Sequence, residues 1–124
     1  MASLEVVRQR LLVLHKALVD DERRDHEKTL GRLSDGEFLD ALIKDPAFAW
    51  LAPLTGLIVR LDELVEEEDP ARERAEQSFV TAIRELLAPK AVTSDFHRRY
   101  ADFLQRSPEV VVAHGEVMRA LKAA

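Results

Sequence analysis

The sequence contains no cysteine, and this absence removes three kinds of chemistry at once. A chain without thiols cannot form a disulfide, attack a substrate through sulfur or hold a metal with thiolate ligands. Glycine is also scarce, with four residues in 124, and none of them forms a phosphate-binding loop or a nucleophile elbow. Any metal site would therefore have to use histidine and carboxylate ligands.

Positive charge is not in excess either, because the formal net charge is −5 at pH 7. General nucleic-acid binding depends on a basic surface, so we expect no nucleic-acid partner. Arg60 and Asp62 interrupt the most apolar run before it reaches membrane-spanning length, and we expect no membrane partner. The first ten residues lack the pattern of a signal peptide, which favours a cytoplasmic protein.

The length of 124 residues suits one domain, 1–124, that buries its own core. The alternation of apolar and polar residues that is typical of strands is absent, and apolar residues recur at spacings of three and four instead. No internal repeat or long linker divides the chain. We therefore predict an all-α fold, a soluble helical bundle of about five or six helices.

Residues 45–69 form the most apolar run and hold the only tryptophan. At 3.6 residues per turn, the apolar side chains of this run fall on one arc roughly 140° wide. These side chains are Trp50, Leu51, Leu54, Leu57, Ile58, Leu61, Leu64 and Val65. An arc of this width predicts contacts with at least two neighbouring helices. We therefore predict a central helix over 46–68 that is kinked near Pro53, or divided there into a short and a longer piece.

Capping signals set the remaining helix boundaries. Gly31 predicts the end of a first helix that begins near Ser3 and reaches Leu30. Ser34 and Glu37 have the spacing of a capping box, which predicts a second helix start. A capping residue followed by proline predicts further starts, because proline is favourable at the first helical position. These starts are Asp45–Pro46, Asp69–Pro70 and Ser107–Pro108, with Ser94 or Thr93 ahead of one more helix.

Three stretches of the sequence carry a resemblance to other proteins. They are residues 14–18 (LHKAL), 45–51 (DPAFAWL) and 107–114 (SPEVVVAH). Together they resemble a group of small bacterial proteins that are entirely helical and have no established activity. The resemblance implies a bacterial, soluble, all-helical protein, and it implies no catalytic or binding residue.

Two histidines lie within apolar stripes, where an imidazole needs a hydrogen-bond partner. His15 falls among the leucines of the first helix and His114 among the valines of the last, and an unsatisfied buried polar group costs about 1–3 kcal/mol. Two carboxylates, Glu22 and Asp62, lie on suitable helix faces. The leading interpretation is that these four residues are satisfied core groups that fix the helix register. The alternative is a polar site in which they bind a small ligand or a metal between helices.

Spacing gives weaker support to a metal site. Glu22 and His26 are four residues apart, so both can reach one ion from the same helix face. The Glu-x-x-His pairs of di-iron bundles and the His-Glu-x-x-His motif are absent. The alternative for Glu22 and His26 is a solvated pair near the helix end, and we predict no cofactor. The arginine pairs 23–24 and 98–99 lie beside acidic residues, which predicts a salt-bridged surface.

The lack of a catalytic motif favours a protein that is not an enzyme and acts through protein–protein contact. Self-association as a homodimer is the leading prediction, with another protein as the alternative partner. Phe48, Trp50 and Leu51 lie at the start of the predicted central helix. Large apolar and aromatic side chains are enriched at interface centres, so these three are the predicted interface residues.

Overall fold

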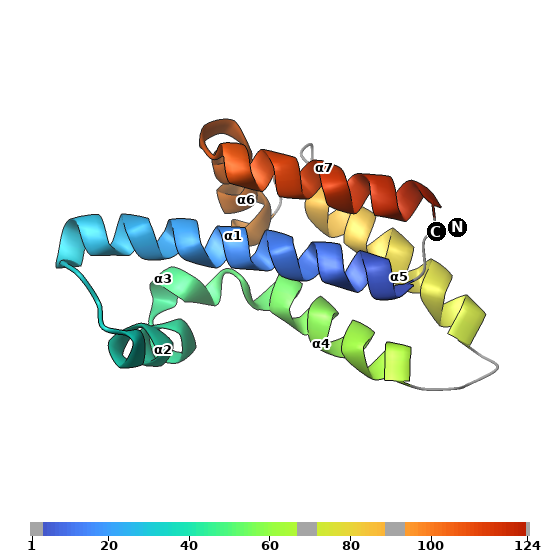
Figure 1. The fold of residues 1–124 in the computed structure, drawn as a ribbon, viewed down its shortest axis with the longest axis horizontal. Helices are drawn as coiled ribbons and strands as arrows, with labels where there is room; N and C mark the ends of the chain where they lie inside the picture. Colours follow the sequence, from blue (N-terminus) through green and yellow to red (C-terminus); the bar gives the residue numbers. More distant parts are fainter. Residues whose placement is uncertain (1–3, 67–71, 89–93, 124) are drawn as a thin grey trace.

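The computed structural model describes residues 4–66, 72–88 and 94–123 (Figure 1). Every regular element in these ranges is an α-helix, so the predicted all-α class is confirmed, with seven helices in the described residues where about five or six were predicted. The helices are α1 (Leu4–Leu30), α2 (Asp35–Lys44), α3 (Pro46–Ala49), α4 (Ala52–Glu66), α5 (Arg72–Leu87), α6 (Asp95–Arg106) and α7 (Pro108–Ala123). None of the described helices is long and apolar enough to cross a membrane.

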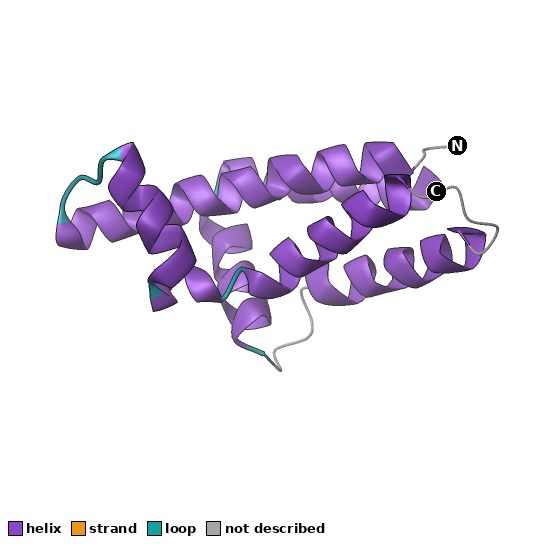
Figure 2. Ribbon diagram, turned by 90° about the horizontal axis from the view of Figure 1, so that it is seen from below, coloured by secondary structure: helices purple, strands orange, loops and turns teal. Residues whose placement is uncertain are grey.

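The longest helix, α1, lies between two groups of helices (Figure 1). It packs against α7 on one side and against α3 and α4 on the other, and α5 and α6 complete the bundle next to α7. The two most extensive helix–helix contacts, α1 with α7 and α1 with α4, enclose the core. Helix α2 lies at one end of the molecule, where it packs on α3 and has no fully buried residue (Figures 1 and 2).

The segment predicted as one central helix consists of α3 and α4, which are separated by a turn at Trp50 and Leu51. This is the divided form of the two that the sequence predicts. Asp45 caps α3 by accepting a hydrogen bond from the backbone N–H of Ala47 at 2.9 Å. Pro53 lies in the first turn of α4, where a missing N–H breaks no helical hydrogen bond. The described part of α4 ends at Glu66, so the predicted end at residue 68 lies outside the described residues.

The other caps follow the local signals. Gly31 ends α1 with a φ of 87°, a left-handed conformation in which glycine has no steric penalty. Ser34 and Glu37 form a capping box, with hydrogen bonds of 3.2 and 3.1 Å between each side chain and the other's backbone N–H. Ser94 caps α6. The predicted caps at Asp69–Pro70 and Thr93 lie outside the described residues.

The apolar arc of α3 and α4 is buried, as the periodicity predicts. Leu54 and Leu61 have no exposed surface, and Leu57 and Ile58 are each 6% exposed. Burial of this kind contributes roughly 1.5–3 kcal/mol for each large side chain, before the loss of conformational entropy is subtracted. This arc and the leucine stripe of α1 form one part of the core, and apolar residues of α5, α6 and α7 complete it.

Candidate functional site

The two histidines predicted to share a polar site instead connect different pairs of helices. His15 Nε2 lies 2.9 Å from Thr55 Oγ1, which joins α1 to α4. His114 Nδ1 lies 2.6 Å from the hydroxyl oxygen of Tyr100, which joins α7 to α6. Burial lowers the pKa of both imidazoles, because a protonated ring loses its solvation there. Each histidine is therefore satisfied by a neutral hydroxyl partner.

The two carboxylates of the predicted site also have separate partners. Glu22 is 8% exposed and lies 3.9 Å from Arg99 of α6. Burial raises the pKa of Glu22, and the positive charge of Arg99 opposes that shift. Asp62 of α4 pairs with Arg8 of α1 at 3.3 Å. Each of the four candidate site residues thus has a different partner, and the leading interpretation, in which they are separately satisfied groups, describes their contacts.

Glu22 and His26 do not converge on a common point either. The ring of His26 lies 5.6 Å from that of Phe48, and its Nε2 lies 3.7 Å from a carboxylate oxygen of Asp45. Glu22 faces α6 instead. Among the described residues, no group of three or more histidines and acids could hold a metal ion.

The three residues predicted to form an interface lie inside the chain. Phe48, Trp50 and Leu51 are 2%, 4% and 2% exposed. The indole of Trp50 stacks on the ring of Phe103 of α6 at 5.6 Å, with an angle of 11° between the planes. A strong apolar pattern predicts burial, but it does not distinguish the chain's own core from a contact with a partner. The accessible surface for a partner therefore lies elsewhere.

One accessible apolar surface is a groove between α1 and α7, with a volume of about 480 Å³. The two helices run antiparallel, and ion pairs of Arg10 with Glu116 and of Arg24 with Glu109 fix their register. The apolar residues that line the groove are Val13, Ala17, Pro108, Val112 and Ala113. The valines are 56% and 65% exposed, whereas the alanines are 9% and 4% exposed. Two projecting valines therefore flank a floor of small side chains.

Charged side chains border this groove. They are Lys16, Asp20, Glu109 and Glu116. Lys16 Nζ lies 2.6 Å from Asp20, and this ion pair raises the pKa of Lys16. Glu116 pairs with Arg119 at 2.8 Å. The border thus carries one lysine and three carboxylates, and each carboxylate has a basic partner within 4.0 Å.

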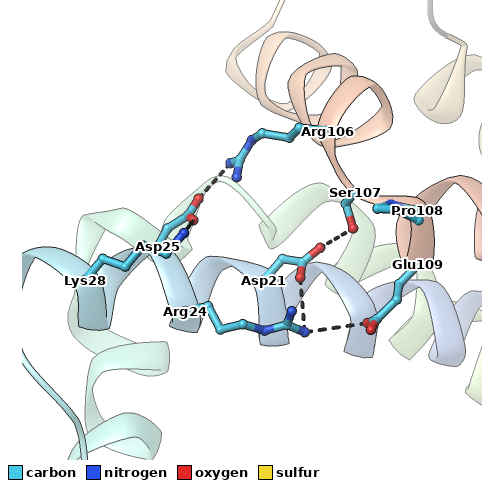
Figure 3. Close-up of a pocket in the computed structure, with 8 residues that line it drawn as sticks. All are labelled: Asp21, Arg24, Asp25, Lys28, Arg106, Ser107, Pro108 and Glu109. Carbon is cyan, nitrogen blue, oxygen red and sulfur yellow. Dashed lines mark hydrogen bonds and ion pairs between the residues drawn. The ribbon is translucent and has the colours of Figure 1, made fainter.

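A second, charged pocket of about 320 Å³ adjoins the groove and shares Pro108 and Glu109 with it (Figure 3). In this pocket the Ser107 hydroxyl donates a hydrogen bond to Asp21, which is 9% exposed. Arg24 bridges Asp21 at 3.2 Å and Glu109 at 3.6 Å (Figure 3). These contacts hold the start of α7 against α1.

The same pocket holds a second set of ion pairs. Arg106 donates hydrogen bonds of 2.7 Å to Asp25 and to Asp102, and both carboxylates raise the pKa of Arg106. Lys28 lies 4.0 Å from Asp25. Each of these charges has a partner of opposite sign, and the ion pairs connect α1 to the α6–α7 corner. The sequence showed Ser107 only as a cap and Asp21 only as a neighbour of arginines, because their contact spans 86 positions.

Comparison of the chain with protein-family models, with curated proteins and with solved structures found no match. The resemblance to small bacterial helical proteins stays a prediction.

Proposed function

We propose that this protein is a helical interaction module that pairs with a second copy of itself along the groove between α1 and α7. The observation that carries the proposal is the exposure of Val13 and Val112, at 56% and 65%, on either side of an apolar hollow. Covering these valines removes apolar surface from water, which favours association. The proposal keeps the predicted homodimer and moves its interface from Trp50 to this groove.

The groove has the shape that a two-fold pair requires. In such a pair both copies use the same surface, so the surface has to supply both projecting and receiving parts. Val13 and Val112 project, and Ala17 and Ala113 form a floor that leaves room for them. A two-fold axis along the groove lays α1 of each copy over α7 of the other, so each valine faces the alanine floor of the opposite copy.

The charges at the border favour this arrangement. The pairs of Arg10 with Glu116 and of Arg24 with Glu109 place Lys16 opposite the stretch of α7 around Ala113, about one helical turn from Glu116. With the axis along the groove, the long side chain of Lys16 in each copy can therefore reach Glu116 of the other. Exposed ion pairs contribute only about 0–1 kcal/mol, so we expect the valines to supply affinity and the charges to set the orientation.

The test is sedimentation velocity over a range of micromolar concentrations. We expect the wild-type chain to dimerise and Val112→Asp to weaken the dimer at least about tenfold, because a carboxylate then has to be buried in the groove. The matched control is Val111→Asp. Val111 is 48% exposed on the same helix and does not line the groove, so this variant should dimerise as the wild type does. A monomeric wild type, or equal losses in both variants, would reject the proposal.

Charge exchange tests the orientation separately. Lys16→Glu should weaken the dimer about two- to fivefold. The double variant Lys16→Glu with Glu116→Lys should recover most of that loss, because the pair is restored with reversed signs. Recovery in the double variant supports the axis along the groove, and its absence rejects that axis even where the dimer itself is retained.

A further inference from the structure

A cleft of about 270 Å³ lies between α4 and α5, apart from the groove and the charged pocket. Its lining consists of Leu57, Arg60, Ala75, Ser78, Phe79 and Ala82. Leu57 is 6% exposed and Phe79 is half-buried, so an apolar floor lies below the helix surface. The small side chains of α5 leave the space between the two helices unfilled.

Two polar groups at the edge of this cleft have unused hydrogen-bonding capacity. Arg60 Nε donates to the carbonyl oxygen of Gly56 at 3.3 Å, and no carboxylate of the described residues lies within ion-pair distance of its guanidinium. The Ser78 hydroxyl has no hydrogen-bond partner in the part of the chain that the structure describes. Several other arginines are paired with a carboxylate, as Arg8 is with Asp62 and Arg106 is with Asp25.

We propose that this cleft binds a small monocarboxylate with an apolar body, such as a phenyl-substituted or medium-chain aliphatic acid. The ligand's carboxylate accepts hydrogen bonds from Arg60 and Ser78, and its apolar part contacts Leu57 and Phe79. The combination of an apolar floor with a few convergent polar groups is typical of small-molecule sites. The proposal does not depend on the dimer, because the cleft and the groove share no residue.

The chemistry of the lining selects this ligand class over others. A neutral apolar ligand leaves the guanidinium without an anionic partner, so it loses a charge-assisted hydrogen bond. A ligand with a second negative charge has to place that charge against Leu57 or Phe79, or bring it close to a chain whose net charge is already −5. The volume lies just below the roughly 300–1,000 Å³ of typical ligand pockets, so the ligand is small.

The test is a titration of the ¹⁵N-labelled protein, followed by NMR, with 3-phenylpropionate and with the neutral 3-phenylpropionamide. We expect saturable shift changes in α4 and α5, centred on Arg60 and Ser78. The amide should bind at least about tenfold more weakly, because it forms no ion pair. No saturable shifts, shifts centred on other helices, or equal binding of acid and amide would overturn the proposal.

Three variants test the charge of Arg60 and the space of the cleft separately. Arg60→Gln should weaken binding of the acid about tenfold and leave the amide unaffected. Ala82→Leu fills the cleft from α5, so it should abolish binding of both compounds while the spectrum stays that of a folded chain. Arg98→Gln removes the same charge from α6. Arg98 does not line the cleft and is distant from Arg60 in the sequence, so this variant should bind the acid as the wild type does. Unchanged binding in Ala82→Leu, or equal losses in the two arginine variants, would also overturn the proposal.

Discussion

Each of the four histidines contacts a residue of another helix or its cap. The contacts are His15 with Thr55, His26 with Asp45, His97 with the carbonyl oxygen of Glu85, and His114 with Tyr100. In each contact the imidazole has a polar partner on another element of the bundle. The contact therefore fixes the packing of the two elements that it joins. These contacts therefore affect the stability of the fold. For His15 and His114, whose pKa burial lowers, the effect depends on protonation.

The free energy of unfolding should fall on mild acidification. Burial lowers the folded pKa of His15 and His114 below their ordinary value of 6.5. Their contribution is therefore present above about pH 6.5 and is lost as the pH falls through the folded pKa values. Urea unfolding followed by circular dichroism should give a lower free energy at about pH 5.5 than at about pH 7.5.

The double variant His15→Gln with His114→Gln is the control for this pH dependence. Glutamine keeps hydrogen-bonding capacity without a proton to gain, so the double variant should lose less stability over the same pH range. Glu22, whose pKa burial raises, gains stability on acidification, but it is present in both proteins and cancels in the comparison. An identical pH dependence in both proteins would contradict this assignment to the histidines.

Ser107→Ala should be more destabilising than the loss of an ordinary helix cap. The Ser107 side chain accepts a hydrogen bond from the backbone N–H of Val110 and donates one to the buried Asp21. We expect a loss of about 2–3 kcal/mol, the sum of a cap and a charge-assisted hydrogen bond. The matched variant Ser94→Ala removes a cap whose hydroxyl contacts the solvent-accessible ring of His97 rather than a buried carboxylate, so it should lose about 1 kcal/mol. Equal losses in urea unfolding would mean that the contact with Asp21 contributes nothing.

At the scale of helices, the ends are where sequence and structure agree most closely. A cap joins groups that lie within a few positions of each other, such as Ser34 and Glu37, so the local pattern contains all the information that the structure uses. Gly31 ends α1 for the same reason. The turn between α3 and α4 was predicted only as one of two forms, because Pro53 permits both a kink and a new start.

The candidate sites could not be predicted in this way, because they join positions far apart in the chain. Val13 and Val112 line the same groove only because α1 and α7 pack against each other. His15 and His114 share an apolar environment, but the helices that bring each one a partner differ. The pattern around Trp50 predicted burial and gave no sign of whether the chain or a partner would cover it.

Two glycines differ in the backbone conformation that their places in the helices require. Gly31→Ala should cost about 1 kcal/mol, because residue 31 has a φ of 87° at the end of α1. Gly56→Ala should instead stabilise the protein by about 0.5–1 kcal/mol, because it lies inside α4. An added Cβ meets nothing within 4 Å at either position, so the backbone alone decides the sign. Thermal unfolding checks both, and a stabilised Gly31→Ala would contradict the prediction.

For the molecule as a whole, charge opposes the proposed dimer and shape favours it. Each copy has a formal net charge of −5, so two copies repel each other at a distance. The apolar contact between the valines and alanines of the groove depends little on ionic strength. The balance between these two effects should therefore respond to salt.

The dimer should tighten when the ionic strength rises. Salt screens the repulsion between copies, with a Debye length that falls from about 10 Å at 0.1 M to about 3 Å at 1 M. The proposed pair of Lys16 in one copy with Glu116 in the other is weakened too, but exposed pairs of this kind contribute little. Sedimentation velocity at low and high sodium chloride should show a smaller dissociation constant at high salt. Dissociation by salt would show instead that ion pairs, and not the valines, supply the affinity.

Trp50 is the only tryptophan of the chain, and its indole is 4% exposed between the rings of Phe96 and Phe103. It therefore provides an intrinsic fluorophore that occupies the junction of α6 with the turn between α3 and α4. Trp50 lines neither the groove nor the cleft, so its emission should shift to the red when the core opens and stay constant when either surface is occupied. Loss of folding and loss of binding can thus be told apart optically in one unlabelled sample.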